Sequence, residues 1–142
     1  MEKISVSDLS VGDYVCAEQL CGVHSEPRLT PPMRVVSLGG GAGGWVNLEI
    51  DPEQGDPFEF EPSEIRGVPI TAEVLEKSGF THDKWSNKIW RYEDEESEVV
   101  YYIECSKVVI TTNDCKMYIT CKSVAELQHA LRLAKVGKEI VL

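Results

Sequence analysis

Apolar residues recur at spacings of three and four positions near the carboxyl end of the chain, the pattern of an amphipathic helix. They are Val124, Leu127, Ala130, Leu131 and Ala134. Ser123 and Glu126 have the spacing of a capping box, which predicts where this helix begins. Gly137 is predicted to end it, because glycine accepts the left-handed conformation that follows a last helical turn. Residues 140–142 are too apolar to remain free in water, and the helix needs a sheet to cover.

The amino-terminal half reads as strands. Phe58–Glu61 alternates apolar and acidic side chains, and residues 33–38 and 45–50 are strands joined by a glycine-rich hairpin tip. Before them, Val11–Asp13 predicts a turn that leads Tyr14 into the first strand, an arrangement typical of SH3-like barrels. We expect a barrel or curled sheet that ends near Arg66.

The second half predicts a short helix, capped by Thr71 and stopped by Gly79, before three or four antiparallel strands and the final helix. The expected fold class is therefore α+β. It comprises a β-rich SH3-like lobe over residues 1–66 and an α+β lobe over residues 67–142, with one continuous domain as the alternative. Cys105 is expected to fill core space. The other predicted core residues are Tyr14, Val35, Val46, Phe58, Phe60, Leu75, Phe80, Trp90, Tyr102, Ile110, Ile119, Leu127 and Leu131.

Composition narrows the class of protein. The 142 residues are 42% hydrophobic and 27% charged, as in soluble globular proteins. No apolar run approaches the roughly 20 residues that span a bilayer, and the first residues lack the apolar core of a signal peptide, so we expect a cytoplasmic protein without membrane contact. Five cysteines, an odd number, are read as reduced thiols. No nucleophile motif, phosphate loop or metal-ligand set is found, so we expect no enzyme, no cofactor and no metal site.

The net charge of −10 argues against a general nucleic-acid binder. Acidic residues gather in two regions, which are read as solvated surface. The candidate binding residues from them are Glu59, Glu61 and Glu64 in the first region and Glu95 and Glu96 in the second. A basic tail with Lys122, Arg132 and Lys135, and with Trp85 or Trp90 as stacking groups, is too sparse to favour direct nucleic-acid binding.

Histidines offer little catalytic signal. His24 lies in the proline-bearing loop from Leu20 to Pro32 and is a further candidate binding residue. Cys21 and His24 could form a nucleophile pair, but spacing alone shows neither a lowered thiol pKa nor an ordered partner. His129 falls off the centre of the helix stripe, which places it at the boundary or surface.

Three segments carry a resemblance to other sequences: residues 8–15, 68–80 and 123–131, the last followed by Gly137–Ile140. Together they resemble a family of small uncharacterised proteins from Bacteroidetes genomes, phages and mobile elements. The resemblance implies a bacterial or phage cytoplasmic origin and an accessory role, and it makes the loop around residues 21–32 an insertion. It implies no activity.

Two functions are consistent with these patterns. The first is a small non-enzymatic interaction module that contacts a protein partner through the Leu20–Pro32 loop or the groove between the lobes. The second is an acidic decoy, in which residues 49–64 and 93–98 lie together and occupy the basic channel of a nucleic-acid-binding protein. A shared face for Glu59, Glu61, Glu64, Glu95 and Glu96 would favour the decoy.

Overall fold

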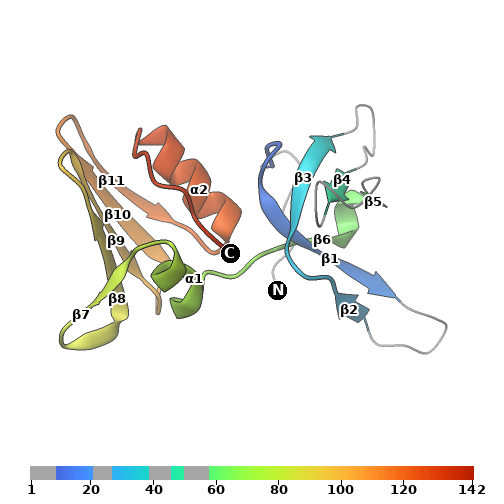
Figure 1. Cartoon of the computed structure of the whole chain (residues 1–142), viewed down its shortest axis with the longest axis horizontal. Coiled ribbons are helices and arrows are strands. Elements are labelled where there is room, and N and C mark those ends of the chain that lie inside the picture. Colours follow the sequence, from blue (N-terminus) through green and yellow to red (C-terminus); the bar gives the residue numbers. More distant parts are fainter. Residues whose placement is uncertain (1–8, 21–26, 39–45, 50–57) are drawn as a thin grey trace. The chain divides into compact units, whose positions relative to one another are not determined.

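The computed structural model describes residues 9–20, 27–38, 46–49 and 58–142 (Figure 1). The chain divides into two compact units, Met1–Val68 and Pro69–Leu142, and each is described by itself. The predicted boundary lay after residue 66. Two antiparallel sheets and two α-helices among the described residues confirm the α+β class. None of the described helices is long and apolar enough to cross a membrane.

A six-stranded antiparallel sheet makes up the first unit, in which β1 pairs with β2, β3 and β6, and β3 continues the sheet through β4 to β5. One edge of β1 serves two strands in succession, since Val15 pairs with Met33 and Glu18 pairs with Leu29. Pro31 and Pro32 separate those two strands, because proline has no N–H to donate to a ladder. The elements are β1 (Tyr14–Leu20), β2 (Pro27–Leu29), β3 (Met33–Leu38), β4 (Val46–Glu49), β5 (Phe58–Phe60), the 3-10 helix η2 (Pro62–Glu64) and β6 (Ile65–Gly67).

The core of this unit follows the alternation of its strands. Its buried residues are Leu9, Val15, Ala17, Met33, Val35, Val46, Phe60 and Ile65. The predicted turn before β1 is confirmed: Gly12 has φ +97°, and an Asp13 carboxylate oxygen accepts the Ser10 N–H at 2.7 Å. Tyr14 was wrongly expected in the core. Because Val15 and Ala17 point inward, Tyr14 points to the other face and is 37% exposed. The predicted core side chain of Phe58 lies outside the description.

Five antiparallel strands form the sheet of the second unit, in the order β11-β10-β9-β8-β7. Three or four were expected. The additional strand is β7, whose Thr-His-Asp sequence has no apolar residue to reveal it. The strands are β7 (Thr81–Asp83), β8 (Ser86–Glu93), β9 (Ser97–Tyr102), β10 (Lys107–Thr112) and β11 (Lys116–Thr120).

Both helices of this unit lie on the same face of the sheet (Figure 1). The helix α1 (Ala72–Lys77) begins at Thr71, whose hydroxyl accepts the Val74 N–H, and Gly79 follows its end with φ +89°, as predicted. The helix α2 (Val124–Leu133) begins at Ser123, whose hydroxyl accepts the Glu126 N–H at 3.2 Å. These two starts confirm the capping predictions.

The end of α2 differs from the prediction. Lys135, with φ +60°, takes the left-handed position that was expected of Gly137. The Lys135 N–H reaches the Arg132 carbonyl and the Val136 N–H reaches the Leu131 carbonyl, which is the bonding of a Schellman motif. Val136 is buried, so the chain turns where an apolar residue can return to the core.

Three core predictions in this unit are wrong. Tyr102 is 36% exposed because Val99 and Tyr101 take the inward positions of β9. Cys105 is exposed because β9 ends at Tyr102 and residues 103–106 form the hairpin turn to β10. Ile119 is only half-buried because β11 is an edge strand. Leu75, Phe80, Trp90, Ile110, Leu127 and Leu131 are buried as predicted.

Candidate functional site

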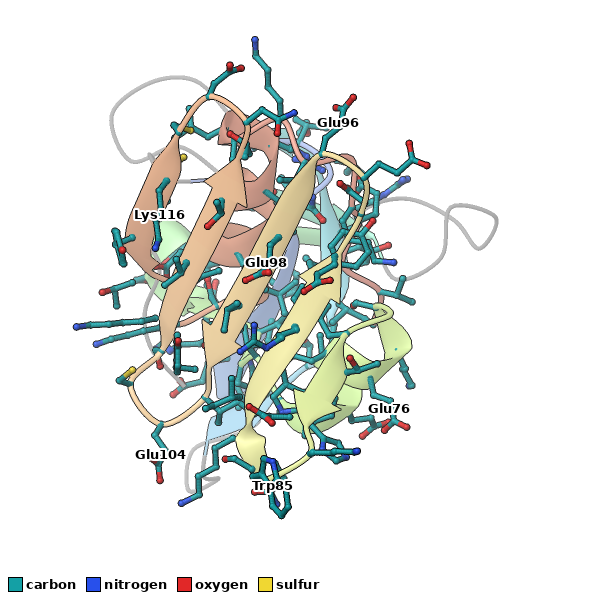
Figure 2. The ribbon with its side chains drawn as sticks, turned by 90° about the vertical axis from the view of Figure 1, so that its left-hand side faces the viewer. Glu76, Trp85, Glu96, Glu98, Glu104 and Lys116 are labelled. Carbon is teal, nitrogen blue, oxygen red and sulfur yellow. The ribbon has the colours of Figure 1, made fainter. Side chains whose placement is uncertain are left out.

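The face of the second unit's sheet that points away from α1 and α2 is here called the open face (Figure 2). Strand alternation fixes which side chains it carries, because Val99 and Tyr101 point toward the helices and their neighbours point the opposite way. From β8 to β11 these are Ile89, Arg91, Glu93, Glu98, Val100, Tyr102, Lys107, Val109, Thr111, Lys116, Tyr118 and Thr120. The open face is therefore apolar along its middle and charged toward its ends.

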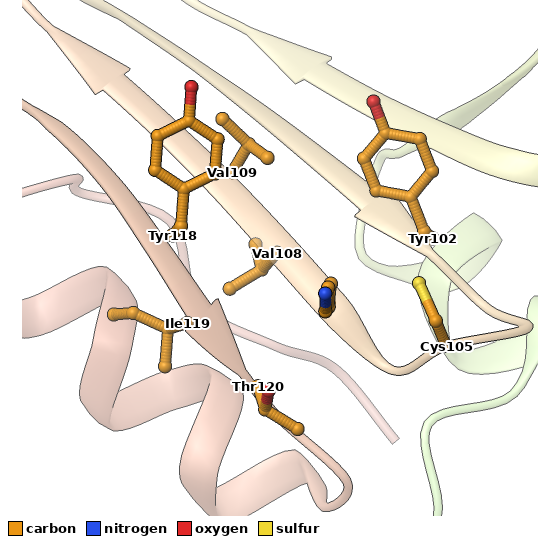
Figure 3. Close-up of a pocket in the computed structure, with 8 residues that line it drawn as sticks. Tyr102, Cys105, Val108, Val109, Tyr118, Ile119 and Thr120 are labelled. Carbon is orange, nitrogen blue, oxygen red and sulfur yellow. The ribbon is translucent and has the colours of Figure 1, made fainter.

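A hollow of about 480 Å³ lies on the open face between two tyrosines (Figure 3). Tyr102 stands on β9 opposite Lys107, and Tyr118 stands on β11 opposite Val109. Strand spacing puts the two tyrosine Cα atoms about 12 Å apart, across β10. Val109 forms the floor, with Lys107 and Cys105 at one end. The hollow has room for an aliphatic or aromatic side chain between the rings.

Aromatic exposure is high at this end of the sheet. Tyr118 is 70% exposed, and the Lys116 ammonium lies 5.5 Å from its ring centroid. Trp85, in the turn between β7 and β8, is 92% exposed and lies at the same end of the sheet as Glu104 (Figure 2). Trp and Tyr are enriched among the residues that dominate binding energy in protein interfaces, because their rings offer a large apolar area.

Two ion pairs lie on the same sheet, outside the lining of the hollow. The Arg91 guanidinium lies 3.5 Å from the Glu98 carboxylate, and Lys88 of β8 pairs with Glu104 in the turn after β9. Both pairs are well exposed, so they contribute little to stability. Lys107 places a positive charge on the wall of the hollow.

The acidic turn between β8 and β9 is a second feature of this unit. An Asp94 carboxylate oxygen accepts the Glu96 and Ser97 N–H groups at 2.8 and 2.7 Å, and these hydrogen bonds lower the pKa of Asp94. Glu95 and Glu96 are exposed beside it. Glu96 and Glu98 line a shallow hollow of about 240 Å³ with residues of the β10–β11 turn.

The other predicted binding residues belong to the first unit. Glu61 is exposed, and the Glu64 carboxylate accepts the Glu61 N–H at 2.9 Å across η2. The side chain of Glu59 and the whole of His24 lie outside the described residues. The structure thus brings Glu61 beside Glu64 and Glu95 beside Glu96, each pair in its own unit.

The thiols differ in environment. Cys16 and Cys121 are buried, and burial raises both pKa values, that of Cys121 to about 12. Cys105 and Cys115 are exposed. Within the described ranges, no three His, Cys, Asp or Glu side chains gather as metal ligands. His129 is half-buried, as predicted.

Sequence reasoning missed Tyr102, Val109 and Tyr118 as site residues. The signal that could have found them is the alternation of β11, in which Lys116, Tyr118 and Thr120 all take one face. Tyr118 on an edge strand, facing away from the only predicted covering helix, implies an exposed ring.

Comparison with protein-family models, with curated proteins and with solved structures returned no match to this chain.

Proposed function

We propose that this chain is a small non-enzymatic protein-binding module and that its partner binds the open face. The observation that carries the proposal is the hollow between Tyr102 and Tyr118, with an apolar floor and a strongly exposed Trp85 at the same end of the sheet. Exposed aromatic groups around one concave, apolar centre are the arrangement in which a few residues supply most of a binding energy.

The hollow favours one kind of ligand group. Its floor and walls suit an apolar side chain, and the Lys107 ammonium on its wall suits a carboxylate next to that side chain. The partner is therefore a protein whose exposed segment carries an apolar residue beside Asp or Glu. This proposal has the contact on the sheet rather than on the Leu20–Pro32 loop, of which residues 21–26 lie outside the described part of the chain.

The experiment compares variants in affinity capture from lysate of a Bacteroidetes host, followed by a binding titration with the protein that is captured. Tyr102→Ala and Trp85→Ala remove hot-spot rings without touching the core, and each is expected to weaken binding about 30-fold. Leu133→Ala is the matched control, because Leu133 is an apolar residue of α2 that is 73% exposed. A partner that binds both ring variants as tightly as the wild type would refute the proposal.

Cysteine alkylation gives an independent test. Cys105 lines the hollow and is exposed, so a bound partner should slow its alkylation about tenfold or more, as read by peptide mass spectrometry. Cys115, exposed at the far end of β10 and β11, is the internal reference. Equal protection of the two thiols would place the partner elsewhere.

A second candidate function is the acidic decoy of a nucleic acid, with Glu95 and Glu96 as contact residues. The ordered acidic turn supports it, because Asp94 fixes the backbone that presents both carboxylates. A decoy predicts a basic partner that is released as salt rises and that fails to bind the Glu95→Gln/Glu96→Gln variant. Retention through the salt step with loss in Tyr102→Ala supports the module instead.

We also infer that the first unit is an SH3-like barrel. Its support is the strand order, in which a meander of β3, β4 and β5 is followed by η2 and by a last strand that returns to β1. The resemblance of residues 8–15, 68–80 and 123–131 supports a bacterial or phage cytoplasmic origin.

A further inference from the structure

The two edges of the five-stranded sheet differ in how they are protected. At one edge, β7 has three residues and its pairing with β8 shifts register between His82 and Asp83. Short strands and register irregularities both prevent an edge from pairing with another chain. At the other edge, β11 has five residues in unbroken register with β10. Lys116 is the only charged residue of β11, and it lies at one end.

Hydrogen bonding determines which backbone groups of β11 point outward. The Thr112 N–H bonds the Cys115 carbonyl and the Cys121 N–H bonds the Ser106 carbonyl. Because ladder bonds alternate along an antiparallel pair, Met117 and Ile119 also bond toward β10. The N–H and carbonyl groups of Lys116, Tyr118 and Thr120 therefore point away from the sheet, and no described strand pairs with them.

These outward groups are symmetric about Tyr118. We propose that β11 pairs in antiparallel register with β11 of a second copy of this chain, about a twofold axis at Tyr118. In this register Tyr118 lies opposite the partner's Tyr118 in a hydrogen-bonded pair, and Lys116 lies opposite the partner's Thr120. The five-stranded sheets of the two copies join at this edge, and the two open faces become one surface.

The side chains fit this register on both faces. Met117 and Ile119 are half-buried. In the proposed register, Met117 of one copy lies opposite Ile119 of the second copy, and each covers the remaining apolar surface of the other. The pairing with the second copy ends at Thr120, because just beyond it Ser123 is bridged by Pro69 of the same chain. Lys116 lies opposite the uncharged Thr120 of the second copy at both ends of the pairing, so the register sets no like charges directly opposite each other.

The test is sedimentation velocity of the full chain over a wide range of concentrations, without any partner protein. The wild type should change from 15.9 kDa toward twice that mass as its concentration rises. Thr120→Lys sets a lysine opposite the partner's Lys116 at two symmetric positions, so dimerisation should weaken about tenfold. Thr120→Glu replaces repulsion with attraction at the same positions and should strengthen dimerisation about tenfold.

Controls separate the register from net charge and from folding. Thr81→Lys and Thr81→Glu make the same changes on β7 and should leave the dimerisation constant within about twofold of the wild type. Circular dichroism of each variant reports folding. A mass of 15.9 kDa at every concentration overturns the proposal, and so does a shift in the same direction for Thr120→Lys and Thr120→Glu. Neither result depends on the partner proposed for the hollow.

Discussion

Gln128 is the side chain that fastens the carboxyl-terminal segment to α2. It is 7% exposed, its amide nitrogen donates to the Lys138 carbonyl at 3.2 Å, and its amide oxygen accepts the Ile140 N–H at 2.8 Å. Replacing Gln128 with methionine keeps the length and volume of the side chain but removes both hydrogen bonds. Gln128→Met therefore isolates the polar contribution from the packing contribution.

The expected magnitude follows from these two bonds. Each hydrogen bond contributes about 1 kcal/mol net, and a donor or acceptor left buried without a partner costs about as much or more. Ile140 is 6% exposed, so its N–H cannot reach water without opening the segment. We expect Gln128→Met to lower the free energy of local opening by about 2 kcal/mol, which speeds amide exchange at Ile140 about 30-fold.

Native-state hydrogen exchange by NMR is the appropriate assay, because it resolves single amides. The Val141 N–H, which donates to the Ser78 hydroxyl at 2.8 Å, belongs to the same segment and reports whether that segment opens as one body. Both amides should speed up if the segment opens as one body, whereas amides in the middle of β9 should not change. Exchange at Ile140 within about twofold of the wild type would refute the assignment of Gln128 as the fastening residue.

Three further predictions concern the same layer of the molecule. Leu131→Ala, at a fully buried position, should cost about 2–5 kcal/mol in urea unfolding, and an unchanged midpoint would contradict the packing of α2. Ser123→Ala removes the cap of α2 and should cost about 1 kcal/mol in the same assay, whereas Ser123→Asp should retain most of the stability. Burial raises the Cys121 pKa from 9.0 to about 12. The folded state therefore keeps the thiol protonated at pH values between about 9 and 12, at which the unfolded chain loses that proton. Stability should therefore fall as pH rises from about 9 toward 12, and by less in Cys121→Ala, measured by unfolding at each pH.

Local signals in the sequence predicted the helix starts well. Thr71 and Ser123 cap their helices as expected, because an N-cap depends on a hydroxyl and the N–H three residues later. The end of α2 was misplaced because it depends on Val136 reaching the core beside Leu131, which is a tertiary contact. The preference of glycine for the left-handed conformation pointed to the wrong residue.

The candidate site was harder to predict for the same reason. Acidic runs stand out in a sequence, and they drew attention to Glu95 and Glu96. Tyr102 was instead predicted to be a core residue, since an aromatic residue in a strand is usually buried, and Tyr118 was not singled out at all. Their exposure follows from both helices covering one face, and that arrangement is a property of the whole second unit rather than of any local segment.

Lys135, which follows the end of α2, lowers the stability of the fold through its left-handed backbone conformation. A residue with a β-carbon in the left-handed conformation costs roughly 1 kcal/mol relative to glycine, and Lys135 adopts φ +60° there. Gly79 shows the inexpensive solution at the end of α1, with the same Schellman bonding. The substitution Lys135→Gly should therefore raise the free energy of unfolding, and it alters neither the open face nor β11. In directed evolution, a variant that carries Lys135→Gly could tolerate a later, destabilising substitution at the hollow.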